Sequence, residues 1–523
     1  MRYATKQMLG LSDTIPALLR EAAERFGDHP AYVEGEHTLS YAALRTRVEA
    51  VAATYADLGV APGGRIVVWG PNSIDWAVAA LAVSYAGGVL VPVNSRYVGP
   101  EVADVVERTR AAVVVVHDGF LGRDQVGELA AAGVAAPVVR LQDLVTRTPR
   151  SEPFAHEDVS PDDVADILFT SGTTGRSKGA MSAHRQSIGV ARAWAELGGV
   201  RQDDRYLVVN PFFHSFGYKI GILVGLLTGA TLYPVPTFDL DETMRIIESE
   251  RITVLPGAPT IYQSLLTAPG RAERDLSSLR LAVTGAAVVP VVLIERMRAP
   301  APEGLGIDQV VTAFGMTEAV VVTMCREGDS AETVATTCGR AIPGMETRIG
   351  DPDDTGAGEL LVCGEHVMLG YLDDPAATAE AIDEDGWLHT GDVGVLDEQG
   401  NLSITDRLKD MYISGGFNVY PAEVEQVLAR MDGVADVAVV GVPDERMGEV
   451  GKAFVVATDE HGVAPEDVIA FARERLANFK VPRHVEVVSG LPRNLSGKVL
   501  KTQLRLDTPP RPSAATRRPN PED

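Results

Sequence analysis

The hydrophobic positions of the chain fall into short apolar runs separated by stretches with helical spacing. A helix is predicted where apolar side chains recur three or four positions apart, as in Leu18, Leu19, Ala22 and Phe26. Short, mainly apolar runs predict buried strands at 66–69, 111–117 and 164–168. Strands that alternate with helices favour parallel sheets covered by helices, so the pattern predicts an α/β fold.

The same alternation continues through the middle of the chain. Further strands are predicted at 206–210, 252–255, 281–284 and 309–312, each followed by a glycine or proline and a polar turn. Open α/β sheets bind ligands at the carboxyl ends of their strands, so we expect the chemistry in these turns.

One uncharged stretch, residues 76–95, is long enough to be considered as a membrane span. Gly87, Gly88 and Pro92 argue against a continuous apolar helix. We therefore predict a buried helix, a glycine break and a strand at 89–93, with no membrane span.

The pattern changes in the last third of the chain. Residues from about 356 to 406 predict a smaller β subdomain, and those after 409 predict an α+β unit with a helix at 421–428. The tail carries five prolines and no periodicity, which is typical of disorder. The predicted domains are 1–408, a mobile C-terminal domain 409–506 and a disordered tail 507–523.

Composition narrows the classes of function. The length of 523 residues favours more than one hydrophobic core. The net charge of -25 argues against nucleic acid or an anionic membrane surface as a partner. Three cysteines without a CxxC pair, and an N-terminus without an apolar signal core, favour a reducing and hence cytoplasmic setting. The oligomeric state stays open, a homodimer included.

A glycine- and threonine-rich loop follows the strand predicted at 164–168. Its sequence, Phe169-Thr-Ser-Gly-Thr-Thr-Gly-Arg-Ser-Lys-Gly179, combines close backbone approach at glycine with hydroxyl donors and two cations. Consecutive N–H groups in such a loop form a nest for anions, so it predicts a triphosphate site. Ser177 stands where a Walker A box needs glycine, and a mobile surface turn is the alternative interpretation.

The loop resembles the phosphate-binding signature of the adenylate-forming superfamily, which includes acyl-CoA synthetases, peptide-synthetase adenylation domains and beetle luciferases. Four further motifs resemble that superfamily in the same order: Phe314-Gly-Met-Thr-Glu318, His389-Thr-Gly-Asp392, Asp406-Arg-Leu-Lys-Asp410 and Arg493-Asn-Leu-Ser-Gly-Lys498. Each motif alone also fits an ordinary polar loop, but five in family order, from about Ser12 to Leu506, are far more specific.

The resemblance implies a large N-terminal domain with two α/β parallel-type sheets and a β subdomain, followed by a small mobile α+β domain. It implies ATP, Mg²⁺ and coenzyme A as ligands. The residues implied to bind ATP or AMP are Thr170, Ser171, Gly172, Thr173, Thr174, Gly175, Lys178, Gly285, Ala286, Ala287, Thr312, Ala313, Phe314, Gly315, Met316, Thr317, Asp392, Arg407 and Lys498.

Several of these positions also have implied catalytic roles. The catalytic set is Lys498, Thr317, Glu318 and His214, with Glu318 as the metal ligand. Lys409 is implied to be the interdomain hinge, and a loop that resembles the pantetheine tunnel is implied to bind coenzyme A through Ser414, Gly415, Gly416 and Phe417.

An aromatic-dense segment after the strand at 206–210 is implied to line the acyl site, although it also fits an ordinary core. Its candidates, with one residue of a later apolar run, are Phe213, His214, Phe216, Gly217, Tyr218, Lys219 and Ala319. The segment looks most like actinobacterial ligases for propanoates on fused steroid-derived rings, and like enzymes for polycyclic terpenoid acids. Tyr218 and Lys219 offer donors for a ring ketone, and a surface charge is the alternative for Lys219.

These inferences predict an acyl-CoA ligase that activates a bulky, polycyclic carboxylic acid through an acyl-adenylate. Four alternatives remain: transfer of the acyl group to a carrier protein or partner enzyme, a medium- or long-chain fatty acyl-CoA synthetase, a luciferase-like oxygenase, and a nucleotide-binding scaffold without activity.

Overall fold

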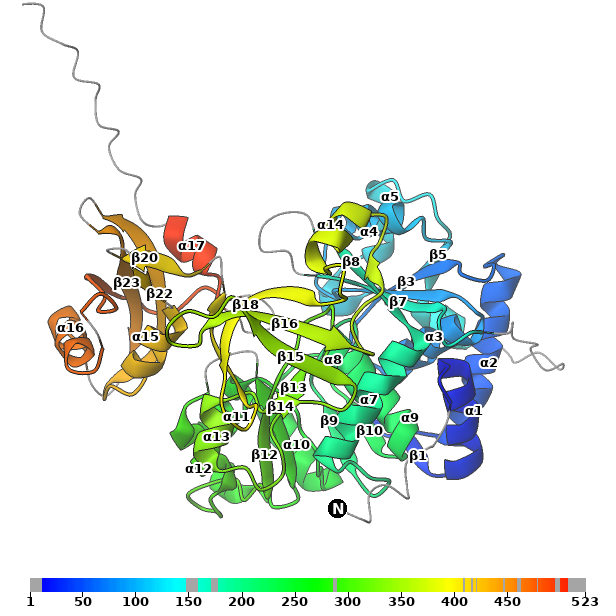
Figure 1. Ribbon diagram of the computed structural model, residues 1–523. Coiled ribbons are helices and arrows are strands. Elements are labelled where there is room, and N and C mark those ends of the chain that lie inside the picture. The colour runs from blue at the N-terminus through cyan, green and yellow to red at the C-terminus, as the bar shows by residue number, and fades with distance from the viewer. Residues whose placement is uncertain are drawn as a thin grey trace, which may run out of the picture. The chain divides into compact units, whose positions relative to one another are not determined.

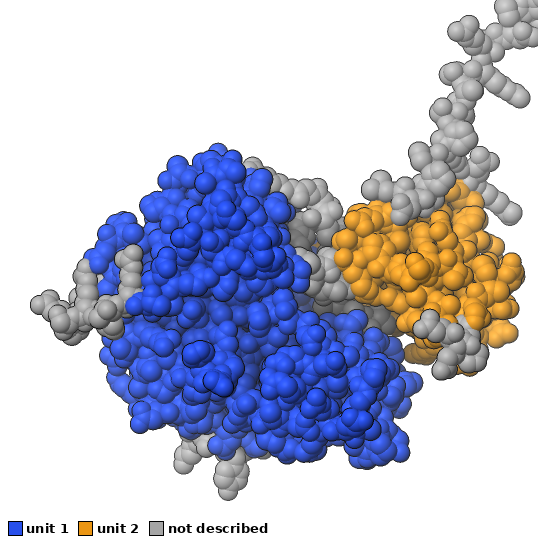
Figure 2. All heavy atoms as spheres, turned by 180° about the vertical axis from the view of Figure 1, so that it is seen from behind, with its two compact units in different colours: residues 1–390, 395–403 blue, residues 391–394, 404–523 orange. Residues whose placement is uncertain are grey.

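The computed structural model describes residues 12–146, 159–170, 177–285, 289–407, 410–414, 417–419, 421–444, 447–458, 462–476, 478–493 and 499–506. The chain divides into two compact units, coloured separately in Figure 2. The first unit comprises Met1–Thr390 and Val395–Ser403, and the second comprises Gly391–Gly394 and Ile404–Asp523. The tail 507–523, predicted to be disordered, lies outside the described residues.

A seven-stranded sheet forms the first layer of unit 1 (Figure 1). Its order is β17 (Gly370–Tyr371), β8 (Gly179–Ala183), β7 (Val164–Phe169), β4 (Val89–Val93), β3 (Arg65–Trp69), β5 (Val113–Val116) and β6 (Val138–Arg140). The strands from β7 to β6 are parallel, and β8 and β17 are antiparallel to their neighbours. The strands predicted at 66–69, 111–117 and 164–168 are all present.

The central strands of this sheet are buried on both faces, as their mainly apolar sequences require. Val67 and Trp69 of β3 point to a core that α4 (Gly99–Thr109) and α5 (Gln125–Ala131) complete. The alternate residues Ile66 and Val68 are equally buried and lie on the opposite face, where α3 (Ile74–Tyr85) packs on β3 and β4. The helix, glycine break and strand predicted within 76–95 are thus confirmed as α3 and β4.

A second sheet joins two four-stranded sets. The first set is β2 (His37–Ser40), β1 (Pro30–Glu34), β10 (Thr231–Pro234) and β9 (Arg205–Val208), and the second is β11 (Leu281–Gly285), β12 (Gln309–Phe314), β13 (Thr323–Met324) and β14 (Arg340–Ala341). The strand predicted at 252–255 is wrong as a continuous element: Val254 alone bridges β9 and β11. The N–H groups of Thr253 and Val254 both donate to the carbonyl of Arg205, which interrupts the ladder.

Helix α7 (His184–Gly198) lies between the two sheets. It packs on β7 and β8 and on the π-helix η3 (Tyr218–Leu223), and Trp194 of α7 stacks on Tyr206 of β9 with 6.1 Å between ring centroids. A third, four-stranded sheet follows in the order β15 (Met345–Gly350), β16 (Gly358–Gly364), β18 (Leu388–Leu396) and β19 (Leu402–Arg407), and the boundary between the units passes through β18 and β19.

Unit 2 contains a smaller sheet with helices on both faces. Its strands are β21 (Phe417–Val419), β20 (Tyr412–Ser414), β23 (Gly448–Ala457), β22 (Val434–Asp444) and β24 (His484–Val487), the last paired with β23. Val437 and Val439 face a core with α15 (Pro421–Leu428) and α16 (Pro465–Arg473), whereas Val440 faces the core that α17 (Lys501–Leu506) covers (Figure 1). The helix predicted at 421–428 is confirmed.

Half of the remaining helices begin at a residue whose side chain caps the helix. Thr14 caps the first of them by accepting the N–H of Ala17. None of the helices in the described part of the chain combines the length and the hydropathy that a membrane crossing needs. These helices are α1 (Ile15–Phe26), α2 (Tyr41–Asp57), η2 (Phe120–Gly122), α6 (Leu141–Val145), α8 (Ser215–Gly217), α9 (Val224–Thr228), α10 (Leu240–Glu250), α11 (Pro259–Thr267), η4 (Arg271–Glu273), α12 (Val291–Arg298), α13 (Ala331–Thr336) and α14 (Pro375–Ala381).

Candidate active site

Hydrogen bonds between its two ends close the base of the glycine- and threonine-rich loop. The backbone N–H of Thr170 donates to the carbonyl of Lys178 at 2.8 Å, and the N–H of Lys178 donates to the Thr170 hydroxyl at 3.3 Å. Arg108 of α4 donates to the carbonyl of Ser177 at 2.7 Å, and its guanidinium carbon lies 4.8 Å from the ring centroid of Phe169. The base is therefore fixed, whereas the predicted phosphate-binding residues Ser171, Gly172, Thr173, Thr174 and Gly175 lie outside the described residues.

Tyr371 contacts both Lys178 and Glu318. Its hydroxyl donates to a carboxylate oxygen of Glu318 at 2.8 Å, and the Lys178 ammonium lies 4.9 Å from its ring centroid. Burial, together with the neighbouring Glu318 carboxylate, raises the pKa of Tyr371, so the hydroxyl stays protonated and remains a donor. The motifs singled out both charged residues but missed the tyrosine, because β17 is only two residues long and gives no strand pattern.

The turn that carries Glu318 is tight and strained. Val320 has a φ of 56°, a left-handed conformation that a β-branched residue rarely adopts and that costs about 1–3 kcal/mol. A Cβ at Gly315 would come within 1.8 Å of the Val320 carbonyl oxygen, so only glycine fits there. The turn leaves Phe314, Met316 and Thr317 partly exposed, with Phe314 at the end of β12. Such strain is typical of functional sites.

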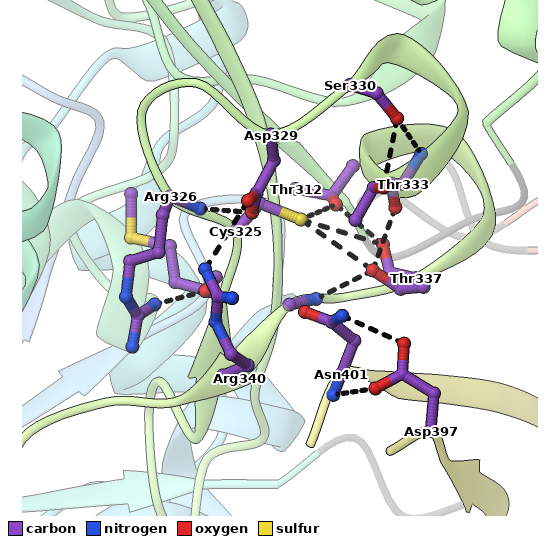
Figure 3. Close-up of polar contacts among 12 residues, drawn as sticks. Thr312, Cys325, Arg326, Asp329, Ser330, Thr333, Thr337, Arg340, Asp397 and Asn401 are labelled. Atoms are coloured by element: carbon purple, nitrogen blue, oxygen red, sulfur yellow. Dashed lines mark hydrogen bonds and ion pairs between the residues drawn. The ribbon is translucent and has the colours of Figure 1, made fainter. Parts of the chain in front are cut away.

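Thr312, expected at the nucleotide, uses its hydroxyl inside the protein (Figure 3). The oxygen lies 2.8 Å from the carbonyl of Val334, 2.7 Å from that of Thr337 and 3.2 Å from the sulfur of Cys325. One hydroxyl has one proton, and the carbonyls already compete for it, so the side chain has no donor left for a ligand. Burial raises the pKa of the Cys325 thiol, which is therefore an unreactive core group.

The neighbouring strand end is built from small residues. Gly285 of β11 pairs with Ala313 of β12, and a Cβ on Gly285 would lie 2.6 Å from the Ala313 carbonyl oxygen. Glycine is therefore required by the sheet itself at this position. Ala286 and Ala287, expected beside the purine, lie outside the described residues.

The aromatic segment divides into an exposed part and a buried part. Phe213 is partly exposed and His214 is exposed, with the His214 Nδ1 accepting the N–H of Phe216 at 3.2 Å. Although solvent reaches the ring, the surrounding protein lowers the pKa of His214 by desolvation, so the imidazole is neutral at pH 7. A Cβ at Gly217 would meet the Pro211 carbonyl within 2.0 Å, and Ala319, on the turn described above, is fully buried.

Lys219 corrects one expectation. Its side chain is 1% exposed, and the ammonium pairs with Asp166 of β7 at 3.0 Å and donates to the Ser182 hydroxyl of β8 at 2.8 Å. The alternative of a surface charge is wrong, and the ammonium is already committed to partners other than a substrate ketone. Tyr218 is also fully buried, so neither side chain is presented to solvent.

The predicted residues of the last quarter are only partly described. Asp392 lies in β18 with its side chain buried, and Arg407 ends β19. Ser414 and Phe417 are not loop residues but pair with each other in the hairpin of β20 and β21, and Ser414 is buried. Lys409, Gly415, Gly416 and Lys498 lie outside the described residues.

The described residues can hold a metal only with the help of a ligand. Within the described ranges, no group of three or more His, Cys, Asp or Glu side chains is placed to bind a metal ion. Mg²⁺ that accompanies a nucleotide needs only one or two carboxylates beside phosphate oxygens and waters. Tyr371 bonds one oxygen of Glu318, and the carboxylate has a second, so Glu318 fits that role.

A cavity of about 400 Å³ lies elsewhere in the first sheet. Arg65, Val89 and Val164, the first residues of β3, β4 and β7, contribute to its lining, with the buried His184. The glycine- and threonine-rich loop follows the last residue of β7, so this cavity is at the opposite end of the strands from the candidate site.

Comparisons with known proteins cover nearly the whole chain. A model of AMP-binding enzymes matches residues 19–372, and a model of the AMP-binding enzyme C-terminal domain matches residues 423–498. A Rhodococcus jostii protein described as 3-[(3aS,4S,7aS)-7a-methyl-1,5-dioxo-octahydro-1H-inden-4-yl]propanoyl:CoA ligase is 55% identical over 516 residues, which cover 94% of this chain and 98% of that protein. The Mycobacterium tuberculosis protein of the same description is 54% identical over 507 residues, which cover 94% and 98%. The crystal structure of ATP-bound MatB from Rhodopseudomonas palustris has a TM-score of 0.86 at 30% identity and covers 95% of this chain and 99% of its own.

Proposed function

The chain belongs to the family of AMP-binding enzymes, and on that basis we propose that it is an AMP-forming acyl-CoA ligase that activates a bulky polycyclic carboxylic acid. The observation that carries the proposal is the 55% identity, over 94% of the chain, to a ligase named for a propanoate on a fused two-ring dione. We take the substrate class to be propanoates attached to such steroid-derived rings. Coenzyme A, rather than a carrier protein, is the acceptor named for both relatives.

The first step is adenylation of the acid. A carboxylate oxygen attacks the α-phosphorus of ATP, a new P–O bond forms, and the bond to the pyrophosphate oxygen breaks. Catalysis of such a transfer is mainly positioning and stabilisation of charge. Lys178, held at the base of its loop, is suited to the phosphates, and Phe314 and Asp392 are proposed for adenine and ribose.

Glu318 is proposed to hold Mg²⁺, which when bound would offset the negative charge of the phosphates. Thr317 lies beside it on the strained turn and is proposed to contact the α-phosphate. Lys498 is proposed to bridge the substrate carboxylate and the α-phosphate. His214, neutral and solvent-accessible next to the partly exposed Phe213, is proposed to border the acyl site.

The second step forms the thioester. The sulfur of coenzyme A attacks the acyl carbon, the C–S bond forms, the C–O bond to the adenylate breaks, and AMP leaves while the thiol proton passes to solvent. The hairpin of Ser414 and Phe417 is proposed to border the pantetheine path, and Lys409 to be the hinge between the two steps.

The test is acid-dependent release of pyrophosphate by the purified protein, followed by mass spectrometry of the thioester. We expect turnover with fused-ring propanoates and little with palmitate or acetate. Lys498→Ala should reduce adenylation about a hundredfold or more, the usual loss for one charge-stabilising donor, and leave thioester formation from supplied acyl-adenylate within a few-fold. If no acid of a broad panel supports pyrophosphate release, the proposal fails.

A further inference from the structure

Tyr371 is held in place from two sides by its backbone. It pairs with Ala180 of β8, the strand that begins directly after Lys178, and the N–H of the next residue, Leu372, donates to the Gly179 carbonyl at 2.8 Å. On the other side its own N–H donates to the Thr378 hydroxyl of α14 at 2.9 Å. The ring is therefore fixed beside the exit of the phosphate loop.

The side chain then separates two opposite charges. Its ring faces the Lys178 ammonium at 4.9 Å from the centroid, within the range of a cation–π contact, and its hydroxyl bonds Glu318 at 2.8 Å. Among the described residues, Lys178 makes no ion pair with a carboxylate. A lysine meant for phosphate and a carboxylate meant for a cation would each lose effect if they paired with one another, because each charge would offset the other.

The hydroxyl also fixes the orientation of the carboxylate. One oxygen of Glu318 accepts from Tyr371, and the main chain of Glu318 is also held, since its carbonyl accepts the N–H of Met368 at 2.7 Å. A carboxylate held at one oxygen presents the other in a defined direction. Preorganisation of this kind reduces the ordering required when a ligand arrives.

We propose that Tyr371 is a positioning residue, which keeps Lys178 and Glu318 from pairing and aims the Glu318 carboxylate at the cation that accompanies the triphosphate. The inference rests on the proposed function, because it assigns that cation and triphosphate to this place. It assigns Tyr371 a role that none of the motifs marks.

The central variant is Tyr371→Phe, which keeps the ring over Lys178 and removes only the hydroxyl. Its matched control is Tyr85→Phe, because Tyr85 also donates to a glutamate, Glu49, at 2.9 Å but lies on α3. The first readout is binding of Mn²⁺ in the presence of a non-hydrolysable ATP analogue, followed by electron paramagnetic resonance. We expect Tyr371→Phe to weaken Mn²⁺ binding about tenfold, the usual effect of losing a hydrogen bond to a charged group, and Tyr85→Phe to leave it unchanged.

The second readout is the Mg²⁺ dependence of pyrophosphate release, with thermal unfolding as the folding check. The Mg²⁺ concentration for half-maximal rate should rise about tenfold in Tyr371→Phe, while thioester formation from supplied acyl-adenylate stays within about twofold. In Tyr371→Phe combined with Glu318→Gln, the rise in the half-maximal Mg²⁺ concentration should be no greater than in Glu318→Gln alone, because the tyrosine acts through the glutamate.

Two results would overturn the inference. One is Mn²⁺ binding by Tyr371→Phe within twofold of the parent, and the other is a rise in the half-maximal Mg²⁺ concentration of the double variant that equals the product of the rises in the two single variants. Failure of the proposed function is recognised separately, since the parent protein would then release no pyrophosphate with any acid, whatever its affinity for Mn²⁺.

Discussion

Replacing Lys219 by methionine is predicted to destabilise unit 1 strongly, although the sequence marked the residue only as a candidate for the acyl site. The Lys219–Asp166 pair has side chains 1% and 0% exposed, with 3.0 Å between ammonium and carboxylate. Asp166 also accepts the Ser187 hydroxyl at 2.8 Å, and Lys219 donates to Ser182 at 2.8 Å. The pair thus connects β7, β8, α7 and the π-helix in the interior.

The magnitude follows from what the substitution leaves behind. Lys219→Met keeps most of the side-chain volume but leaves the Asp166 carboxylate buried without its counter-charge, which typically costs about 3–5 kcal/mol. Combining it with Asp166→Asn removes the unpaired charge, and the amide oxygen can still accept from Ser187. We therefore expect the double variant to recover about 2 kcal/mol or more of the loss, because a buried pair replaced as a whole is often close to neutral.

The measurement is urea unfolding followed by tryptophan fluorescence. All four tryptophans (Trp69, Trp76, Trp194 and Trp387) lie in unit 1, so the signal reports on that unit. Arg245→Met is the control, since the Arg245–Glu242 pair is about half exposed and such pairs contribute under about 1 kcal/mol. A loss below about 1 kcal/mol in Lys219→Met, or a double variant as unstable as the sum of its parts, would refute the reasoning.

Three further predictions follow from the described contacts. Burial lowers the pKa of His184 from 6.5 to about 4, so between these pH values the unfolded chain binds a proton that the folded chain does not. The free energy of unfolding should therefore fall by about 3 kcal/mol as the pH drops from 6.5 to 4. His184→Asn should flatten that decline in urea titrations at several pH values. Thr312→Val should cost about 1–3 kcal/mol in thermal or urea unfolding, because a buried carbonyl loses its donor, yet leave the KM for ATP within twofold. Gly315→Ala should lower the adenylation rate about a hundredfold, because the added Cβ displaces the turn of Glu318; an unchanged pyrophosphate-release rate would contradict this.

Much of the fold could be predicted because local pattern and burial agree. The strands β3, β5 and β7 are mostly apolar and their central residues are buried on both faces, so periodicity alone finds them. The break between α3 and β4 was predictable because Gly87 has a φ of 72°, which favours glycine. The segment at 252–255 has the same apolar character, but only Val254 forms bridges to β9 and β11, and the ladder is interrupted. No local sequence signal reveals that interruption.

The site was predictable only where its chemistry is contiguous in sequence. The turn from Phe314 to Glu318 is one such stretch, and its motif is visible even though the strain at Val320 is not. Tyr371 and Lys219 were missed or misassigned because their partners are distant in sequence. Whether a lysine is a surface charge or half of a buried pair depends on which strand it meets, which composition cannot show.

The hairpin of β7 and β8 explains how these separate contacts act together. Asp166 on β7 holds the π-helix through Lys219, Phe169 at the end of β7 meets Arg108 of α4, and Ala180 on β8 pairs with Tyr371. One rigid pair of strands thus positions the acyl segment, the base of the phosphate loop and, through Tyr371, the Glu318 carboxylate. The exposed His214 instead bonds within its own segment, where its Nδ1 accepts the N–H of Phe216 at 3.2 Å. Substitutions intended to change the acid preference should therefore be tolerated far better at His214 and the partly exposed Phe213 than at Lys219. All three residues nevertheless lie in one short segment.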